Sequence, residues 1–243
     1  MKIFVADNYE KMSKQAAADV IDVMQSRSQP VICAASGHSP AGLYKEIIER
    51  ARNKQVSVDN WLFLGLDEWV GMNGIDQGSC RHHLDLELLN PLRVPEDRIC
   101  FFDGRANDLE AECGRIEKFI HAQGGIDVAI LGLGMNGHIG MNEPGASVNI
   151  RSHVIDLHPI TKTIAQKYFK EEKELAQGIT LGIATLLEAR NLILVVSGIH
   201  KADITQKVLE EAVSENLPGT LLRDHPALKI YLDSEAASKI ISP

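Results

Sequence analysis

Short hydrophobic runs that end in glycine or in small polar residues recur along the chain. A run of this kind, bounded by turn residues, is typical of a buried β-strand. Six segments have this form: 30–35, 61–66, 98–102, 126–131, 191–197 and 227–232. Weaker strand patterns cover residues 2–6, which we expect at a sheet edge, and residues 151–157.

The segments between these runs carry apolar residues at helical spacing. The pattern predicts helices over residues 8–26, 40–53, 79–89, 107–123, 161–169 and 178–187. Strands that alternate with helices favour a parallel sheet covered by helices on both faces. We therefore predict a single α/β domain over residues 1–243, with a doubly wound Rossmann-like fold and a mostly parallel sheet of about six or seven strands.

Composition and charge exclude several classes of partner. The chain has 243 residues, of which 44% are hydrophobic and 24% charged, as in ordinary globular proteins. Its net charge of −8 argues against nucleic acid or an anionic membrane as the main partner. No apolar run is long enough to span a membrane, and the N-terminus lacks the pattern of a signal peptide.

The cysteines point to an intracellular chain without a structural metal. Cys33, Cys80, Cys100 and Cys113 show neither a CxxC motif nor a Cys/His spacing typical of metal sites. Cys33 and Cys100 lie in strand-like runs and are most simply buried thiols. We therefore predict no metal site and expect the protein in a reducing cytoplasm.

The loop after the run at 126–131 carries side chains suited to proton transfer. It is rich in glycine and contains Asn136, His138 and Glu143. Imidazole and carboxylate groups move protons between oxygens, and ligands bind at the carboxyl edge of open α/β sheets. The sequence predicts a site here, and the alternative is a glycine-rich turn in which His138 only caps the backbone. Since Gly132-Leu-Gly134 lacks the third glycine and the acidic residue of a dinucleotide fingerprint, we do not expect NAD.

A second polar stretch, Asp67-Glu68-Trp69, follows the run at 61–66. Adjacent carboxylates at the carboxyl end of a strand suit the mouth of a site better than a core. The alternative is a helix cap or a salt bridge in a loop. A buried Asp67 would have a raised pKa and could act as a base toward carbon.

Two strand–glycine–helix junctions suggest a phosphate site. The first is Ser36-Gly37-His38-Ser39, where Ser39 is the expected N-cap and Pro40 the first helical residue. Free N–H groups and the helix dipole at such a junction favour an anion, although an ordinary capped turn is the alternative. The second junction carries Lys201, which the sequence alone does not distinguish from a solvated surface lysine. Neither junction is a GxxxxGK[ST] loop, so ATP is not indicated.

These residues carry a family resemblance that runs nearly end to end. Leu66-Asp-Glu-Trp-Val-Gly71, together with Leu131-Gly-Leu-Gly-Met-Asn-Gly-His-Ile-Gly-Met-Asn-Glu-Pro-Gly145, resembles the glucosamine/galactosamine-6-phosphate deaminase (isomerase) family. 6-Phosphogluconolactonase shares the fold and a Gly-His loop but lacks the Asn-Glu-Pro continuation. The resemblance implies an enzyme of amino-sugar catabolism that releases ammonia from an amino-sugar 6-phosphate and needs no cofactor.

The resemblance also implies roles for individual residues. It assigns enolisation to Asp67, and ring opening to His138, Glu143 and the residue at position 136, where many members carry Asp instead of Asn. It assigns phosphate contacts to the loop Ser36–Ser39, to Lys201 and to Lys167, which stands where well-known members have Arg. Lys lacks the bidentate fork of Arg. The loop usually reads Thr-Gly-Gly-Thr-Pro, so His38 is a departure that adds a phosphate donor or narrows the sugar pocket.

Several alternatives stay open at this point. The substrate is glucosamine 6-phosphate or galactosamine 6-phosphate, and Trp69 with the motif at 178–182 favours galactosamine. A lactone hydrolase is the rival enzyme, and a non-catalytic sugar-phosphate sensor is the rival from another class. The number of subunits, one or a homo-oligomer, and the role of Glu68 are undetermined.

Overall fold

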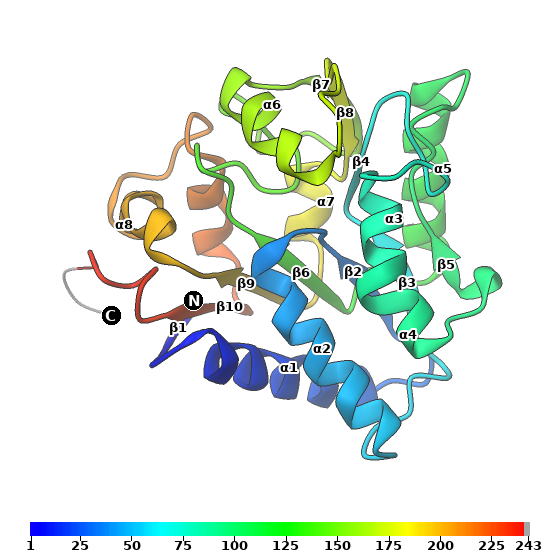
Figure 1. The fold of residues 1–243 in the computed structure, drawn as a ribbon, viewed down its shortest axis with the longest axis horizontal. Helices are drawn as coiled ribbons and strands as arrows, with labels where there is room; N and C mark the ends of the chain where they lie inside the picture. Colours follow the sequence, from blue (N-terminus) through cyan, green and yellow to red (C-terminus); the bar gives the residue numbers. More distant parts are fainter. Residues whose placement is uncertain (241–243) are drawn as a thin grey trace.

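The main sheet has seven strands, and all of their pairings are parallel. The computed structural model describes residues 1–240 (Figure 1). The strands lie in the order β1-β10-β9-β6-β2-β3-β5. Their bounds are β1 (Lys2–Ala6), β2 (Val31–Ala34), β3 (Leu62–Gly65), β5 (Ile99–Cys100), β6 (Val128–Gly132), β9 (Leu192–Val196) and β10 (Leu228–Asp233).

Helices connect the strands on both faces of this sheet, as predicted. The longer ones are α1 (Tyr9–Gln25), α2 (His38–Arg52), α5 (Leu109–Ala122) and α8 (Ala202–Glu210). The shorter ones are α3 (Cys80–Leu84), α4 (Asn90–Leu92), α6 (Pro159–Ala165) and α7 (Ile183–Leu187), with a π-helical turn at Asp85–Leu89 between α3 and α4. Further 3₁₀ turns lie at Glu96–Arg98, Gln166–Tyr168, Ile199–Lys201 and Pro218–Asp224.

Alternation along the strands divides the interior into two cores. Successive side chains of a strand point to opposite faces of the sheet. Ile32 and Ile130 therefore pack with residues of α1 and α2, whereas their neighbours Cys33 and Leu131 pack with α5, α7 and α8. This two-sided burial confirms the predicted doubly wound α/β fold.

The strand order reverses between β2 and β6. From β2 the chain adds β3 and β5 on one side, then returns to place β6 against the other side of β2. Such a switch point separates the loops that follow the two strands and leaves a crevice between them, where ligands of open α/β sheets bind. The two loops here are the glycine-containing segments after β2 and after β6.

A second sheet, which the sequence did not predict, lies beyond the main one. It is antiparallel in the order β4-β8-β7, with β4 (Asp67–Trp69), β7 (His153–Asp156) and β8 (Gln177–Thr180). Figure 1 shows β7, β8 and α6 together at the top, away from α1 and α2 at the bottom. A small third core fills this layer and includes Trp69, Met141 and Leu157.

The predicted helix over 178–187 is wrong in its first half. Gly178, Ile179 and Thr180 belong to β8 and pair with both β4 and β7, and only Ile183–Leu187 is helical. The predicted strand at 151–157 exists as β7, but it belongs to the small sheet. No helix within residues 1–240 combines the length and apolar content needed to cross a bilayer.

Candidate functional site

A pocket of about 170 Å³ opens where the loops after β2 and β6 meet. Its walls come from five segments that are far apart in the sequence, 35–40, 66–69, 132–141, 161–168 and 197–201, and from Cys80. Most of the predicted site residues line it, namely Ser36, Gly37, His38, Ser39, Asp67, His138, Lys167 and Lys201. Asn136 and Glu143 are not among the lining residues and contact the site through His138.

Asp67 supplies a buried carboxylate to one wall. It is the first residue of β4, separated from the end of β3 by Leu66 alone, and only 8% of it is exposed to solvent. Burial raises the pKa of Asp67 to about 6, although a hydrogen bond with Cys80 and the nearby charge of His138 oppose this effect. A carboxylate whose pKa lies near neutrality can take up a proton and release it again.

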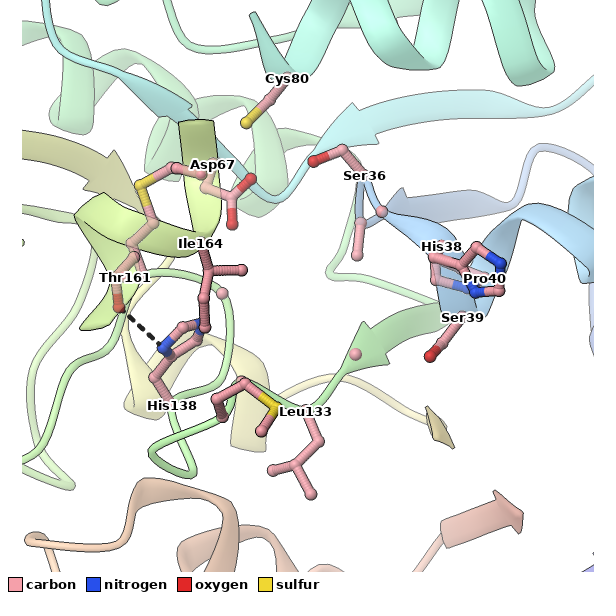
Figure 2. Close-up of a pocket in the computed structure, with 18 of the residues that line it drawn as sticks. Ser36, His38, Ser39, Pro40, Asp67, Cys80, Leu133, His138, Thr161 and Ile164 are labelled. Atoms are coloured by element: carbon pink, nitrogen blue, oxygen red, sulfur yellow. Dashed lines mark hydrogen bonds between the residues drawn. The ribbon is translucent and has the colours of Figure 1, made fainter. Parts of the chain in front are cut away.

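His138 lies on the same side of the pocket and is held by a buried carboxylate. Its Nδ1 is 3.5 Å from Glu143 Oε2 and 3.3 Å from Thr161 Oγ1. In Figure 2 the bond to Thr161 is dashed, and the imidazole lies across the cavity from Ser36 and His38. The Asn136 amide donates to Glu143 Oε2 at 2.8 Å and its Oδ1 accepts the His138 backbone N–H at 3.3 Å, so Asn136 orients the carboxylate and joins it to the loop.

Glu143 is poised to stay ionised. Burial by itself would raise its pKa, but hydrogen bonds from His138, Thr161 and Asn136 and the charge of His138 lower the pKa of Glu143 to about 2. A backbone N–H of His158 also donates to Glu143 Oε1 at 3.2 Å. A carboxylate that is ionised at neutral pH fixes the orientation of the imidazole beside it.

The imidazole has room only because residue 134 is glycine. A Cβ at Gly134 would lie 2.4 Å from three atoms of the His138 ring. The Gly134 N–H also donates to the His138 carbonyl at 2.9 Å, which closes the loop tightly. The glycine spacing noted in the sequence therefore lets the ring fold back over its own loop.

Opposite this wall, the start of α2 presents polar groups to the pocket. The helix begins at His38, one residue before the predicted N-cap, because Gly37 adopts φ 119°, a conformation that favours glycine. Ser39 is thus helical and caps nothing, and its Oγ lies 3.1 Å from Ser197 Oγ at the end of β9. Exposed N–H groups in the first turn of a helix are suited to an anion.

Lysine and histidine side chains surround that helix start. Lys201 is partly buried and donates to the Leu133 carbonyl at 2.6 Å. Burial, and then the charge of Lys167, lower the pKa of Lys201 to about 8. His38, Lys167 and His200 line the pocket from its more exposed rim. The pocket therefore has one end suited to a phosphate and another suited to proton transfer.

The family model for glucosamine-6-phosphate isomerases and 6-phosphogluconolactonase matches residues 6–230. A glucosamine-6-phosphate deaminase of a Geobacillus species is 36% identical over 241 residues, which cover 99% of this chain and 96% of that protein. Its counterpart from Oceanobacillus iheyensis is 37% identical, again with 99% and 96% covered. The chain belongs to this family.

Solved structures agree with the family assignment and confirm the fold. A monomeric glucosamine-6-phosphate deaminase superposes with a TM-score of 0.95 at 33% identity, with 98% of this chain and all of that chain covered. A 6-phosphogluconolactonase from Trypanosoma brucei gives 0.74 at 21% identity, with 98% and 97% covered, which establishes the shared fold alone. The resemblance read from the sequence is thereby confirmed.

Several pocket residues of this family member escaped the sequence argument. Cys80, Thr161, Tyr168, Ser197 and His200 all line the cavity. Thr161 and Tyr168 come from the α6 region, which has no glycine-rich junction to mark it. His200 could have been predicted from the sequence, since it neighbours Lys201 in the second strand–glycine–helix junction. Within residues 1–240, no cluster of three or more His, Cys, Asp or Glu side chains is arranged to hold a metal ion.

Proposed function

We propose that the protein is an amino-sugar-6-phosphate deaminase, which turns a 2-amino-2-deoxyhexose 6-phosphate and water into the ketose 6-phosphate and ammonia. The observation that carries the proposal is the division of one pocket between Asp67 with His138 and a cationic end built by the Ser36–Ser39 loop and Lys201. The names of the relatives support the same chemistry.

The cationic end would bind the phosphate. Backbone N–H groups at the start of α2 and the hydroxyls of Ser36 and Ser39 are suited to its oxygens, and Lys201 and Lys167 add positive charge. Phosphate bound at this end directs the sugar ring toward Asp67 and His138. Binding energy from this remote group would then hold the reacting carbons in place.

Ring opening would use His138 and Glu143. The imidazole takes the proton from the anomeric O1 hydroxyl and returns a proton to the ring oxygen, and the bond between C1 and the ring oxygen breaks to give the open-chain aldehyde. Glu143 stabilises the imidazolium formed in between. Asn136 has no titratable proton at neutral pH, so its part is to hold Glu143.

Isomerisation would use Asp67. Its carboxylate removes the proton from C2 while O1 gains a proton from solvent, which gives an enolamine with a double bond between C1 and C2; that second proton returns to solvent when water adds to C2 in the last step. The same carboxyl group then returns the proton to C1, and the enolamine becomes an imine at C2. Water adds to C2, the C2–N bond breaks, and the ketose 6-phosphate and ammonia leave.

Two amino sugars fit this scheme and differ at C4. The names of the relatives favour glucosamine 6-phosphate. One observation favours galactosamine 6-phosphate: Trp69, which pointed to that branch in the sequence, lines the pocket. The other sequence feature, residues 178–182, contributes no residue to the described lining.

Ammonia release tests the proposal. The protein is incubated with glucosamine 6-phosphate and with galactosamine 6-phosphate, and hydrolysis of 6-phosphogluconolactone serves as the control reaction. We expect ammonia from at least one amino sugar, and the ratio of the two kcat/KM values assigns the C4 preference. Lactone cleavage without ammonia would assign the protein to the hydrolases of the family, and binding without turnover of any substrate would indicate a sensor.

A further inference from the structure

Glu68 is a fully buried carboxylate beside the proposed base, and none of the steps above uses it. Its exposed fraction is 0%. It accepts backbone N–H groups from Trp69 at 2.8 Å, Cys80 at 2.9 Å and Arg81 at 3.0 Å. A buried carboxylate is costly unless its oxygens are hydrogen-bonded, so these three bonds make its burial tolerable.

The direction of the Glu68 side chain follows from that of Asp67. Adjacent residues of a strand point to opposite faces, so when Asp67 faces the pocket, Glu68 faces away from it. On that side lies the N-terminus of the helical segment that begins at Cys80 and continues through α4. Glu68 takes two of the free N–H groups there, and Ser79 Oγ takes a third, from His82.

This junction places a second residue against the base. Cys80 lines the pocket, and in Figure 2 its thiol points toward the Asp67 carboxylate. The Cys80 backbone is held by Glu68, and its side chain hydrogen-bonds Asp67. Glu68 thus ties the backbone of Cys80 to that of Trp69 in β4, the strand that carries Asp67.

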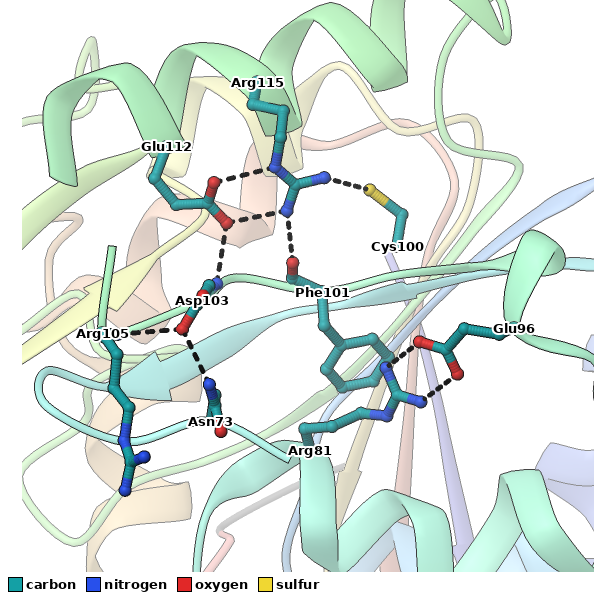
Figure 3. A network of polar contacts seen from close by, with 9 residues as sticks. All are labelled: Asn73, Arg81, Glu96, Cys100, Phe101, Asp103, Arg105, Glu112 and Arg115. Atoms are coloured by element: carbon teal, nitrogen blue, oxygen red, sulfur yellow. Dashed lines mark hydrogen bonds and ion pairs between the residues drawn. The ribbon is translucent and has the colours of Figure 1, made fainter. Parts of the chain in front are cut away.

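The far side of the junction is anchored independently. The Arg81 guanidinium bonds Asp85 at 2.7 Å. Figure 3 shows the same guanidinium paired with Glu96, at 2.7 Å, and lying over the Phe101 ring. In the same view Glu112 accepts the Asp103 N–H, a bond of 2.7 Å. Because these contacts hold Arg81 in place, the hydrogen bonds from the Cys80 and Arg81 N–H groups to Glu68 attach β4 to a fixed helix start.

We propose that Glu68 is a positioning residue, which locks the strand carrying Asp67 to the helix start carrying Cys80 and so holds the base at C2 of the substrate. This role rests on the proposed function. A misplacement of the base by about 1 Å costs on the order of 100-fold in rate, while a phosphate held at the other end of the pocket is bound as before.

The test compares Glu68→Gln with Glu112→Gln in the full-length protein. Both variants replace a buried carboxyl group that accepts backbone hydrogen bonding by an amide, but the hydrogen bonds of Glu112 go to Asp103 and Arg115 and not to β4 or the start of α3. The assay is ammonia release from whichever amino-sugar phosphate the wild-type protein deaminates, with protium and with deuterium at C2. Thermal unfolding of each variant is measured alongside.

We expect kcat of Glu68→Gln to fall about 10- to 100-fold with KM changed by less than about twofold, and the deuterium isotope effect on kcat to rise because proton abstraction becomes slower. Glu112→Gln lowers the unfolding temperature and leaves kcat and the isotope effect unchanged. If Glu68→Gln does not fold, Glu68→Asp, which keeps the charge but is one methylene shorter, carries the same expectation.

Two results would overturn the role and can be told apart. A folded Glu68 variant with the kcat and isotope effect of the wild type removes Glu68 from positioning and leaves the proposed function intact. Failure of the wild-type protein to release ammonia overturns the proposed function and this role with it.

Discussion

Replacing Asp67 by Asn should make the protein more stable at neutral pH while it abolishes activity. The ordinary pKa of an Asp side chain is 3.8, and burial raises that of Asp67 to about 6. The folded protein therefore binds the Asp67 proton more tightly than the unfolded chain does. Ionising the carboxyl group at high pH consequently lowers the free energy of unfolding. The difference between the two pKa values corresponds to about 3 kcal/mol of unfolding free energy.

The dependence on pH follows from the sign of that difference. Below about pH 4 Asp67 is protonated in both states, so a neutral amide in its place changes little. As the pH rises through about 6 the wild-type protein loses this contribution, whereas the variant, which has no proton to lose at this position, does not. We therefore expect Asp67→Asn to gain up to about 3 kcal/mol at pH 7.5 and almost nothing at pH 4.

Urea unfolding at the two pH values, followed by circular dichroism, measures the effect. Asp22→Asn on the exposed face of α1 is the matched control, because it makes the same chemical change at an exposed position. If Asp67→Asn gains the same unfolding free energy at pH 7.5 as at pH 4, or gains none at either pH, then burial does not destabilise the ionised form of Asp67 and the prediction is wrong.

Two further predictions concern the ends of the pocket. Since the pKa of Lys201 is lowered to about 8, the KM of the wild-type protein for the sugar phosphate should rise as the pH passes 8. Lys201→Met should have a KM about 10- to 100-fold higher at pH 7, and its KM should not rise further above pH 8. The same pH dependence of KM in both proteins would contradict this prediction. A Cβ at Gly134 would lie 2.4 Å from the His138 ring, so Gly134→Ala should displace the imidazole and lower kcat at least tenfold, with a nearly unchanged unfolding temperature. A normal kcat in steady-state kinetics would show that the imidazole can work from a different position.

The strands and loops that meet at the switch point were predictable because their signal is local. Each buried run ends in glycine or in small polar residues, and carboxyl ends of parallel strands meet at one edge. That reasoning located Asp67, His138 and the Ser36–Ser39 loop, and the structure brings them around one pocket. The family assignment rested on the same stretches and is confirmed by the comparisons.

The small antiparallel sheet was not predictable in the same way. The residues that pair with β8 are those of β4 and β7, more than 20 positions away in the sequence, and nothing within 178–187 distinguishes a strand followed by a short helix from one longer helix. The start of α2 lies two residues before the predicted one, at His38 instead of Pro40, because the positive φ of Gly37 depends on the surrounding fold. The buried state of Glu68 depends on a helix that begins 12 residues later.

The fate of the C2 proton tests the central claim most directly. The substrate is deuterated at C2, and NMR follows the departure of deuterium from C2 as ammonia forms. The measurement is made for the wild-type protein and for Asp67→Asn at saturating substrate. We expect the wild type to remove the C2 deuterium and release ammonia, and Asp67→Asn to bind the sugar phosphate but do neither. A variant that still removes the deuterium from C2 would contradict the role of Asp67 as the base.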